Sequence, residues 1–326
     1  MVTLEDIRAA QKRIKGVAVR TPLIPCPHGD TQRKLYFKAE SLQPIGAFKI
    51  RGAYNKIAAL PEAERRRGVI TYSSGNHAQG VAYGAREVGI KAVVVMPANT
   101  PKTKIEATRA LGAEVVFVGP ASSERQAKAE ELAAEHGYAI IPPYNDEYII
   151  AGQGTAGLEI LEDLPDVECV LAPVSGGGLL GGIATAIKLS RPEVKVVGCE
   201  PELSADAQES LRTGHLVTWA AEKTTRTICD GLRTQSLGPL NFEHIKRYVD
   251  DIVTVSEDEI REAMRRLALN AHLVAEPSGA VPFAAFLFRA DQLPKARRSV
   301  AVISGGNVEP ALLAEVLQGA AVPAHP

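Results

Sequence analysis

The 326-residue chain has little net charge and no long hydrophobic run. Its 37 basic and 38 acidic residues leave a formal net charge of −1, so no field of one sign favours binding to nucleic acid or to an anionic membrane. No apolar run approaches the roughly 20 residues that span a bilayer. The first residues, Met1 to Arg13, alternate charged and aliphatic side chains, which predicts a helix and excludes a secretory signal peptide.

Cysteine is also scarce. The four cysteines are widely spaced along the chain and form no CxxC pair: Cys26, Cys169, Cys199 and Cys229. This pattern argues against a zinc site and predicts buried thiols in a reducing cytoplasm. The remaining composition, 45% hydrophobic and 23% charged, is that of an ordinary globular protein. A chain of this length can bury a large core, as two domains or as one large domain.

Short runs rich in Val and Ile alternate with amphipathic stretches. The runs end near Gly, Pro or Ser and predict strands buried on both faces of a parallel sheet, at 68–73, 92–96, 113–118, 139–141, 167–174, 194–199 and 300–304. The stretches between them predict helices, at 77–88, 102–111, 124–136, 179–189, 257–270 and 279–288. This alternation predicts an α/β fold with a mostly parallel sheet. Whether the units before and after residue 146 share one sheet is left open by periodicity.

The clearest motif is the glycine-rich segment 175–182, SGGGLLGG. It follows a predicted strand and opens a predicted helix, where backbone N–H groups can point at one anion and the helix dipole adds positive potential. No GK[ST] follows, so it is not a P-loop, and the dinucleotide fingerprint fits poorly, although Glu200 stands about 20 residues further on. The segment favours phosphate binding over the alternative of a tight turn between strand and helix.

Two other turns of small polar residues follow predicted strands. Residues 73–77 read SSGNH, and residues 304–307 read SGGN. Such residues at the carboxyl ends of parallel strands line the ligand crevice of open α/β sheets. The alternatives are a helix N-cap for the first turn and a plain strand-to-helix turn for the second. His77 by itself is more typical of a packed, hydrogen-bonded side chain than of a catalyst.

Lys49 stands among apolar and small residues in the segment 44–53, PIGAFKIRGA. Most lysines are solvated surface charges. Desolvation by such neighbours would lower the pKa of this amine and favour Schiff-base chemistry.

Together, these motifs resemble those of the fold-type-II pyridoxal-phosphate (PLP) enzymes, in the group of serine/threonine dehydratases and serine racemases. The resemblance extends from Thr21 to Asn307 and so covers essentially the whole chain. It implies a two-domain fold like that of the tryptophan synthase β chain, with open, mostly parallel sheets flanked by helices. Residues 1–60 and 147–326 would form a large PLP-binding domain, and residues 61–146 a small mobile domain.

The resemblance also implies a role for individual residues. Lys49 would link covalently to PLP and act as the base at the substrate Cα, with Phe48 packed beside the cofactor. Asn76 would bind the phenolic oxygen of PLP, and Ser304 would face the pyridine nitrogen. The phosphate would be held by Ser175, Gly176, Gly177, Gly178 and Leu179. The substrate carboxylate would be held by Ser73, Ser74, Gly75, Asn76 and His77. Gly231 would be the glycine of the family's pocket.

Ser74 stands where members of the family differ. Threonine dehydratases often have Ala at this position, whereas serine racemases and hydroxyaspartate ammonia-lyases have Ser. On the face of PLP opposite Lys49, a hydroxyl could reprotonate Cα, so racemisation would be available beside elimination.

A divalent metal is implied as well. Glu200, Ser204 and Asp206 match the spacing of a family site for Mg²⁺ or Mn²⁺, in which Ser204 offers its carbonyl oxygen. The residues alone favour a loop with two surface carboxylates.

The predicted function is PLP-dependent β-elimination of L-threonine, L-serine or a related β-hydroxy amino acid to a 2-oxo acid and ammonia. Alternatives on the same scaffold are a serine racemase, a 3-hydroxyaspartate ammonia-lyase and a β-replacement synthase. From another class, a non-catalytic protein could bind a nucleotide phosphate through the glycine turns alone. We expect a cytoplasmic homo-oligomer, dimer or tetramer, with no nucleic-acid or membrane partner. Residues 144–146, YND, could line the pocket or form a turn.

Overall fold

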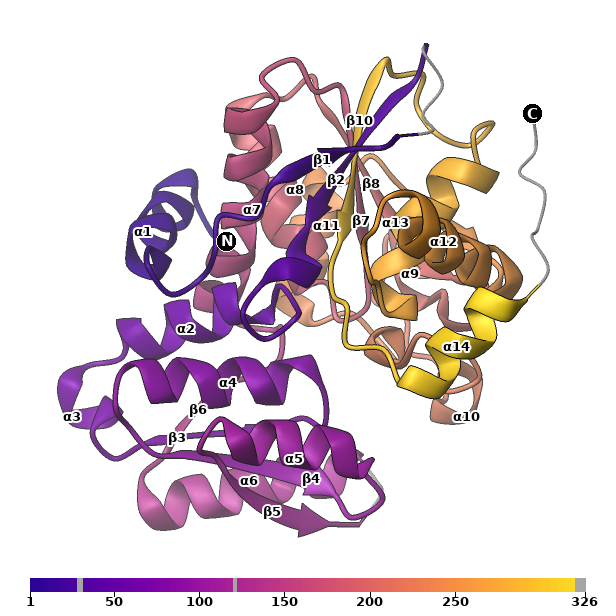
Figure 1. The fold of residues 1–326 in the computed structure, drawn as a ribbon. Coiled ribbons are helices and arrows are strands. Elements are labelled where there is room, and N and C mark those ends of the chain that lie inside the picture. The colour runs from indigo at the N-terminus through magenta and orange to yellow at the C-terminus, as the bar shows by residue number, and fades with distance from the viewer. Residues whose placement is uncertain (28–31, 120–121, 320–326) are drawn as a thin grey trace.

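Two sheets organise the computed structural model, which describes residues 1–27, 32–119 and 122–319 (Figure 1). The larger sheet has six strands in the order β1-β2-β10-β7-β8-β9, and the smaller has four in the order β5-β4-β3-β6. Every neighbouring pair is parallel except β1 with β2. The predicted α/β fold with mostly parallel sheets flanked by helices is therefore confirmed.

The six-stranded sheet combines strands from both ends of the chain. Its strands are β1 (Leu23–Pro25), β2 (Lys34–Ala39), β7 (Cys169–Pro173), β8 (Lys195–Pro201), β9 (Asp251–Val255) and β10 (Arg298–Ile303). Strand β10 pairs with β2 from Arg298 opposite Lys34 to Ile303 opposite Ala39. Strands β7 and β10 are also neighbours, so the segments that follow them leave the sheet side by side.

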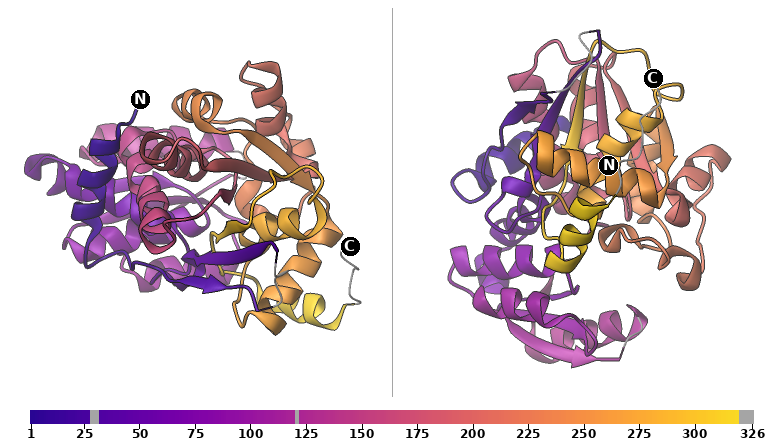
Figure 2. Two further views of the ribbon diagram at one scale, coloured as in Figure 1. Left: turned by 90° about the horizontal axis from the view of Figure 1, so that it is seen from above. Right: turned by 45° about the vertical axis from the view of Figure 1, so that its right-hand side comes forward.

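Helices cover both faces of this sheet (Figures 1 and 2). One face packs on α12 (Glu257–Asn270) and α13 (Pro277–Phe288), and the other on α7 (Glu147–Asp163), α8 (Gly178–Ser190) and α11 (Pro239–Tyr248). Other helices of this part are α1 (Leu4–Ile14), α2 (Lys49–Ala59), α9 (Asp206–Thr213), α10 (Ala221–Thr224) and α14 (Pro310–Gln318). Short 3₁₀ turns are η1 (Glu40–Leu42), η2 (Glu202–Ser204) and η3 (Asp230–Leu232).

The four-stranded sheet is inserted between β2 and β7 in the chain and lies to one side of the larger sheet (Figure 1). Its strands are β3 (Val69–Tyr72), β4 (Ala92–Pro97), β5 (Glu114–Val118) and β6 (Ala139–Ile140). The helices of the same part are α3 (Glu62–Arg65), α4 (Asn76–Glu87), α5 (Lys102–Ala110) and α6 (Ser122–His136). Side chains of β4 alternate between α4 on one face and α6 on the other, as expected of a strand buried on both sides.

The predicted strands and helices match the observed elements to within one or two residues. Three strands (β1, β2 and β9) were not predicted, nor were the helices α2, α7, α9, α10, α11 and α14. The predicted N-terminal helix is α1. Three thiols are buried as predicted, Cys26 is half-buried, and none of the four forms a disulfide. Among the helices of the described residues, none combines the length and apolarity that crossing a bilayer requires.

Candidate active site

The candidate site residues come from both sheets and meet where strands end and helices begin. The glycine-rich segment follows β7, and Ser304 follows β10 on the neighbouring strand. Residues 73–77 follow β3 and open α4. Lys49 is the first residue of α2. Parallel strands carry their ligand crevice at their carboxyl ends, and this arrangement follows that rule.

The backbone around Lys49 is attached to the end of β10. The N–H of Phe48 donates to the Ser304 carbonyl at 3.0 Å, and Ala47 forms an antiparallel bridge with Gly305. On the other side α4 approaches closely, since a Cβ added at Gly80 would lie 3.2 Å from the Lys49 carbonyl carbon. The first turn of α2 is therefore held between the end of β10 and helix α4.

The amine of Lys49 lies in a desolvated environment. Its Nζ donates to the carbonyl of Pro143 at 2.7 Å and lies 5.2 Å from the centre of the Phe48 ring. Within the described residues no carboxylate pairs with it, whereas the buried Lys38 has Glu159 at 2.6 Å. Desolvation lowers the pKa of Lys49 to about 8. A substantial neutral fraction is therefore present at mildly alkaline pH, which makes this amine a competent nucleophile and base.

The glycine-rich segment forms a narrow cradle at the N-terminus of α8. Gly177 has a φ of +92°, which favours glycine, and precedes the first residue of the helix. A Cβ at Gly176 would come within 2.4 Å of the Tyr144 ring, so a side chain there would fill the cradle. The Gly176 carbonyl accepts a hydrogen bond from the Gly238 N–H at 3.0 Å. This geometry, with the positive end of the α8 dipole, fits a phosphate group.

Ser175 and the segment 144–146 line the same region. The hydroxyls of Ser175 and Thr234 lie 2.8 Å apart. Tyr144 packs against the cradle, and burial raises the pKa of its phenol. Asp146 instead caps α7 by accepting from the Tyr148 N–H at 2.9 Å, so of the YND segment Tyr144 is the residue that lies at the cradle. Leu179 is buried in the first turn of α8.

Asn76 sits in a chain of hydrogen bonds that joins four segments. Its Nδ2 donates to Glu276 at 2.7 Å, and its Oδ1 accepts from Asn307 at 2.8 Å. Asn307 also donates to the Ile45 carbonyl at 2.8 Å. Burial first, and then the nearby charge of Asp230, raises the pKa of Glu276 to about 8, so this acid is mainly protonated at neutral pH. Asn307 belongs to the predicted SGGN turn, whereas nothing in the sequence pointed to Glu276.

In the turn 73–77, some polar groups form hydrogen bonds within the protein and the Ser74 hydroxyl forms none among the described residues. Its Gly75 N–H donates to the Ser73 hydroxyl at 3.3 Å, and a Cβ at Gly75 would meet nothing within 4 Å. Ser74 is half-buried and makes no hydrogen bond among the described residues. The buried His77 has its Nε2 2.9 Å from the Ile141 carbonyl, and burial, together with the charge of Lys49, lowers its pKa to about 3. His77 is therefore a packed, neutral side chain.

Gly231 lies at the exposed edge of the site, in η3, and its N–H donates to the Ser278 hydroxyl at 3.0 Å. Ser304 is buried at the end of β10.

The predicted metal ligands meet beyond the end of β8. Glu200, Ser204 and Asp206 are all buried, so the interpretation of a loop with two surface carboxylates is wrong. Glu200 accepts from the N–H groups of Ala207 at 3.2 Å and Gln208 at 2.9 Å, while the Oδ2 of Asp206 is buried without a hydrogen-bond partner in the described structure. Burial raises the pKa of Glu200 well above its ordinary value, with the charge of Asp206 adding to it, and burial raises the pKa of Asp206 to about 7. Two buried carboxylates with an orphaned oxygen fit a hard cation such as Mg²⁺ or Mn²⁺.

Comparison with known proteins gives consistent matches over nearly the whole chain. The family described as "Pyridoxal-phosphate dependent enzyme" matches residues 14–305. The L-threonine ammonia-lyase of Thermotoga maritima is 47% identical over 313 residues, 95% of this chain and 76% of that protein. The catabolic L-threonine dehydratase of Escherichia coli is 42% identical over 312 residues, 94% of each chain. The structure of maize serine racemase, 36% identical, superposes with a TM-score of 0.92 over 96% of both chains.

Proposed function

Because this chain belongs to the family of pyridoxal-phosphate-dependent enzymes, with the fold of the fold-type-II group, we propose that it acts on L-threonine and L-serine. It is a PLP-dependent ammonia-lyase that removes water across Cα and Cβ of a β-hydroxy amino acid, and the enamine then hydrolyses to a 2-oxo acid and ammonia. The observation that carries the assignment of the site is Lys49: a desolvated lysine with no carboxylate partner among the described residues, beside the cradle and the Asn76 chain.

The residues present fit the cofactor. Lys49 would hold it covalently, Gly176 to Gly178 would hold its phosphate at the start of α8, and Asn76 and Ser304 would face its ring. The bound cofactor withdraws electrons from the substrate and so makes its Cα proton acidic. Phe48 would pack beside the ring, since it already lies next to the Lys49 amine.

The chain's own groups would then move the protons. Lys49 would take the Cα proton and, with a pKa of about 8, could return it to the departing hydroxyl. The turn 73–77 would hold the substrate carboxylate through its backbone N–H groups at the N-terminus of α4. His77 would support this turn as a neutral packing group, because its low pKa keeps it uncharged at neutral pH.

Racemisation is a second candidate activity, favoured by one observation. The hydroxyl of Ser74 stands in the substrate-binding turn with no hydrogen-bond partner among the described residues. If it faces Cα from the side opposite Lys49, as the resemblance implies, it would be available to exchange a proton there.

The metal, the division into domains and the assembly are further parts of the proposal. Glu200, Asp206 and the Ser204 carbonyl would bind Mg²⁺ or Mn²⁺, a role supported by the orphaned Asp206 oxygen. Residues 61–146 would move against residues 1–60 and 147–326, which the separate four-stranded sheet supports. The buried thiols of Cys169, Cys199 and Cys229 support a reducing, cytoplasmic compartment. A homo-oligomer stays a prediction, and measurement of the mass in solution tests it.

A product assay over several amino acids tests the function. The purified enzyme is incubated with L-threonine, L-serine and L-threo-3-hydroxyaspartate, and 2-oxo acid, ammonia and D-amino acid are measured. We expect stoichiometric 2-oxo acid and ammonia from threonine and serine, and none from Lys49→Ala. D-amino acid as the main product would establish the racemase instead. Absence of a Schiff-base absorbance band would refute any PLP-dependent activity.

A further inference from the structure

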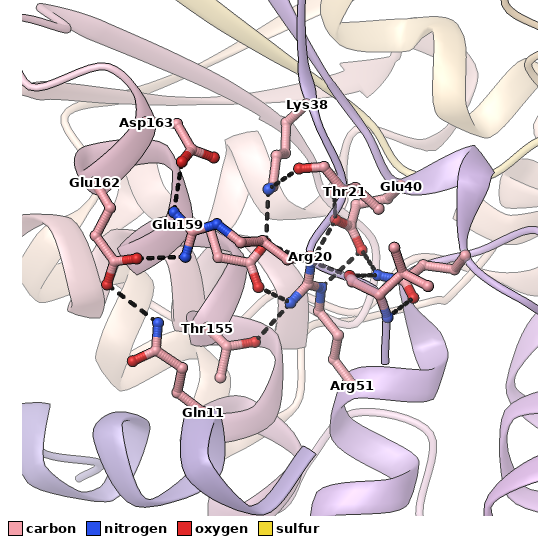
Figure 3. Close-up of polar contacts among 12 residues, drawn as sticks. Gln11, Arg20, Thr21, Lys38, Glu40, Arg51, Thr155, Glu159, Glu162 and Asp163 are labelled. Carbon is pink, nitrogen blue, oxygen red and sulfur yellow. Dashed lines mark hydrogen bonds and ion pairs between the residues drawn. The ribbon is translucent and has the colours of Figure 1, made fainter. Parts of the chain in front are cut away.

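A buried cluster of four charged side chains surrounds the first turn of α2 (Figure 3). It consists of Lys38 from β2, Glu40 from η1, Arg51 from α2 and Glu159 from α7. Their side chains are between 0% and 6% exposed, and their formal charges cancel. We call this group the α2 charge cluster. Neither the predicted site nor the metal ligands include any of its members.

Arg51 is at the centre of the α2 charge cluster and uses its whole guanidinium. It forms one fork with Glu40, with two bonds of 2.8 Å, and another with Glu159, with bonds of 2.7 and 2.8 Å. It also donates to the Thr155 hydroxyl at 3.1 Å and to the Val19 carbonyl at 3.2 Å. A guanidinium has five N–H groups in one rigid plane, so these six acceptors fix both its position and its orientation.

Further hydrogen bonds hold the two carboxylates in place. The Thr21 hydroxyl and the Gln43 amide both donate to Glu40, the latter at 3.0 Å. Lys38 donates to Glu159 and to the Thr21 carbonyl, each at 2.6 Å. The orientation of Arg51 is therefore defined by segments from the N-terminal region, from β2 and from α7 at once. Figure 3 shows these groups converging on one point.

Overall stability does not explain this cluster. Removing four charges from water is expensive, and a buried ion pair replaced by well-packed apolar residues often leaves a protein as stable or more stable. The packing of α2 on α7 is already close, since a Cβ at Gly152 would lie 2.6 Å from the Arg51 carbonyl oxygen. The two-bond pairings of Arg51 with Glu40 and Glu159 add a unique orientation of α2 to this contact.

Lys49 begins the same helix turn, two residues before Arg51. We propose that Arg51 is a positioning residue: its forks to Glu40 and Glu159 fix the rotation of α2 and so hold the Lys49 amine at the point where it reacts. This inference rests on the proposed role of Lys49. A rotation of the helix by a few degrees moves the end of a long side chain by about an ångström, and a misplacement of that size can lower a catalytic rate by about 10²-fold.

The first test replaces Arg51 by lysine, which keeps the charge and loses both forks. We expect kcat to fall at least about tenfold, with the KM for L-threonine nearly unchanged, because substrate binding belongs to the turn 73–77. The matched control is Arg20→Lys. Arg20 also forms ion pairs with α7, one each to Glu162 and Asp163, but it lies on the surface with its side chain 48% exposed (Figure 3). This control should keep the kcat of the wild type.

A second readout reports on Lys49 without catalysis. In the apoenzyme, the pH dependence of amine labelling at Lys49, followed by mass spectrometry, should have its midpoint at about 8 in the wild type and in Arg20→Lys. In Arg51→Lys the midpoint should rise toward the ordinary 10.5, because the amine is no longer held in its desolvated position. Equal midpoints and equal kcat in Arg51→Lys and wild type would overturn the inference.

A second variant covers the case in which Arg51→Lys does not fold. Lys38→Met with Glu159→Gln removes one charge of each sign and leaves the Glu40 fork in place. We expect a thermal midpoint equal to or above that of the wild type, together with a kcat several-fold lower. If kcat is lower only because the variant also has a lower thermal midpoint, the cluster has a purely structural role and the inference is overturned.

Failure of the proposed function gives a different result. Borohydride reduction of the wild-type holoenzyme should trap the cofactor on Lys49. A label on another lysine overturns the proposed function, and this inference with it. A label on Lys49 with an unchanged kcat in Arg51→Lys overturns the inference alone.

Discussion

Replacing Lys49 by methionine should make the cofactor-free protein more stable at neutral pH. The amine is held in a desolvated position that lowers its pKa from the ordinary 10.5 to about 8. That difference corresponds to roughly 3 kcal/mol by which burial of the charged amine opposes folding. Methionine loses the bond from Nζ to the Pro143 carbonyl, worth about 1 kcal/mol, and keeps the length of the side chain. The net gain in the free energy of unfolding should be about 2 kcal/mol.

The pH dependence of this gain has a definite sign. Below pH 8 the lysine is protonated in both states, so the folded wild type bears the full penalty. Between pH 8 and 10.5 the unfolded chain binds more protons than the folded one, so the wild type gains stability relative to the variant as pH rises. The advantage of Lys49→Met should therefore shrink through this window, and at its upper end the variant, which lacks the bond to Pro143, should be the less stable protein.

The measurement is urea unfolding of both apoproteins at a series of pH values from 7 to about 10.5. Lys56→Met is the control on the same helix: Lys56 is paired with Asp146 at 2.6 Å, so its loss should lower stability. An apoprotein with Lys49 that is as stable as the variant at pH 7 would refute the argument that this amine is desolvated.

Three further changes test other parts of the site. Ser74→Ala should lower racemisation by about 10²-fold or more and elimination by less than about tenfold, measured as the ratio of D-serine to pyruvate formed from L-serine; an unchanged ratio would exclude the Ser74 hydroxyl as a proton carrier. Gly75→Ala should leave the thermal midpoint unchanged, since its Cβ meets open space, but should raise KM by obstructing the substrate carboxylate; an unchanged KM would place that carboxylate elsewhere. Chelation should lower the free energy of unfolding of the wild type, and Mg²⁺ or Mn²⁺ at 100 times Kd should raise it again by about 2.7 kcal/mol. Asp206→Asn should abolish this response, and a wild type that does not respond contradicts the metal site.

The sequence predicts best the elements whose signal is local. Strands such as β4 are continuous apolar runs, and a buried parallel strand needs nothing else. The glycine cradle is recognisable in the sequence because three consecutive glycines between a strand and a helix are typical of an anion-binding turn.

The elements that were missed contain charged residues or glycines that are untypical of buried strands and helices. Strand β2 contains Lys38, which is fully buried only because Glu159, far along the chain, neutralises it. Helices α2 and α7 bury Arg51 and Glu159 and contain Gly52 and Gly152, so neither shows a clear apolar stripe or a strong helix propensity.

Hydrogen-bond partners that are far apart in the chain could not be predicted from the sequence either, because only the fold brings them together. Asn76 accepts from Asn307 and donates to Glu276, residues separated from it by most of the chain, and only the fold brings these groups together. Glu276 precedes a proline at the start of α13 and looks in the sequence like any acidic residue at a helix N-terminus.

The pairing of β2 with β10 has a consequence for how the protein is made. Strand β10 lies between β2 and β7, so the larger sheet stays in two pieces until residues 298–303 have left the ribosome. The four-stranded sheet has no such dependence, since its strands are consecutive in the chain between β3 and β6. During synthesis the inserted sheet can fold first, while β1 and β2 wait with an open strand edge for a partner from the other end of the chain. The Lys49 turn, which is attached to the end of β10, takes its final place only in the last step.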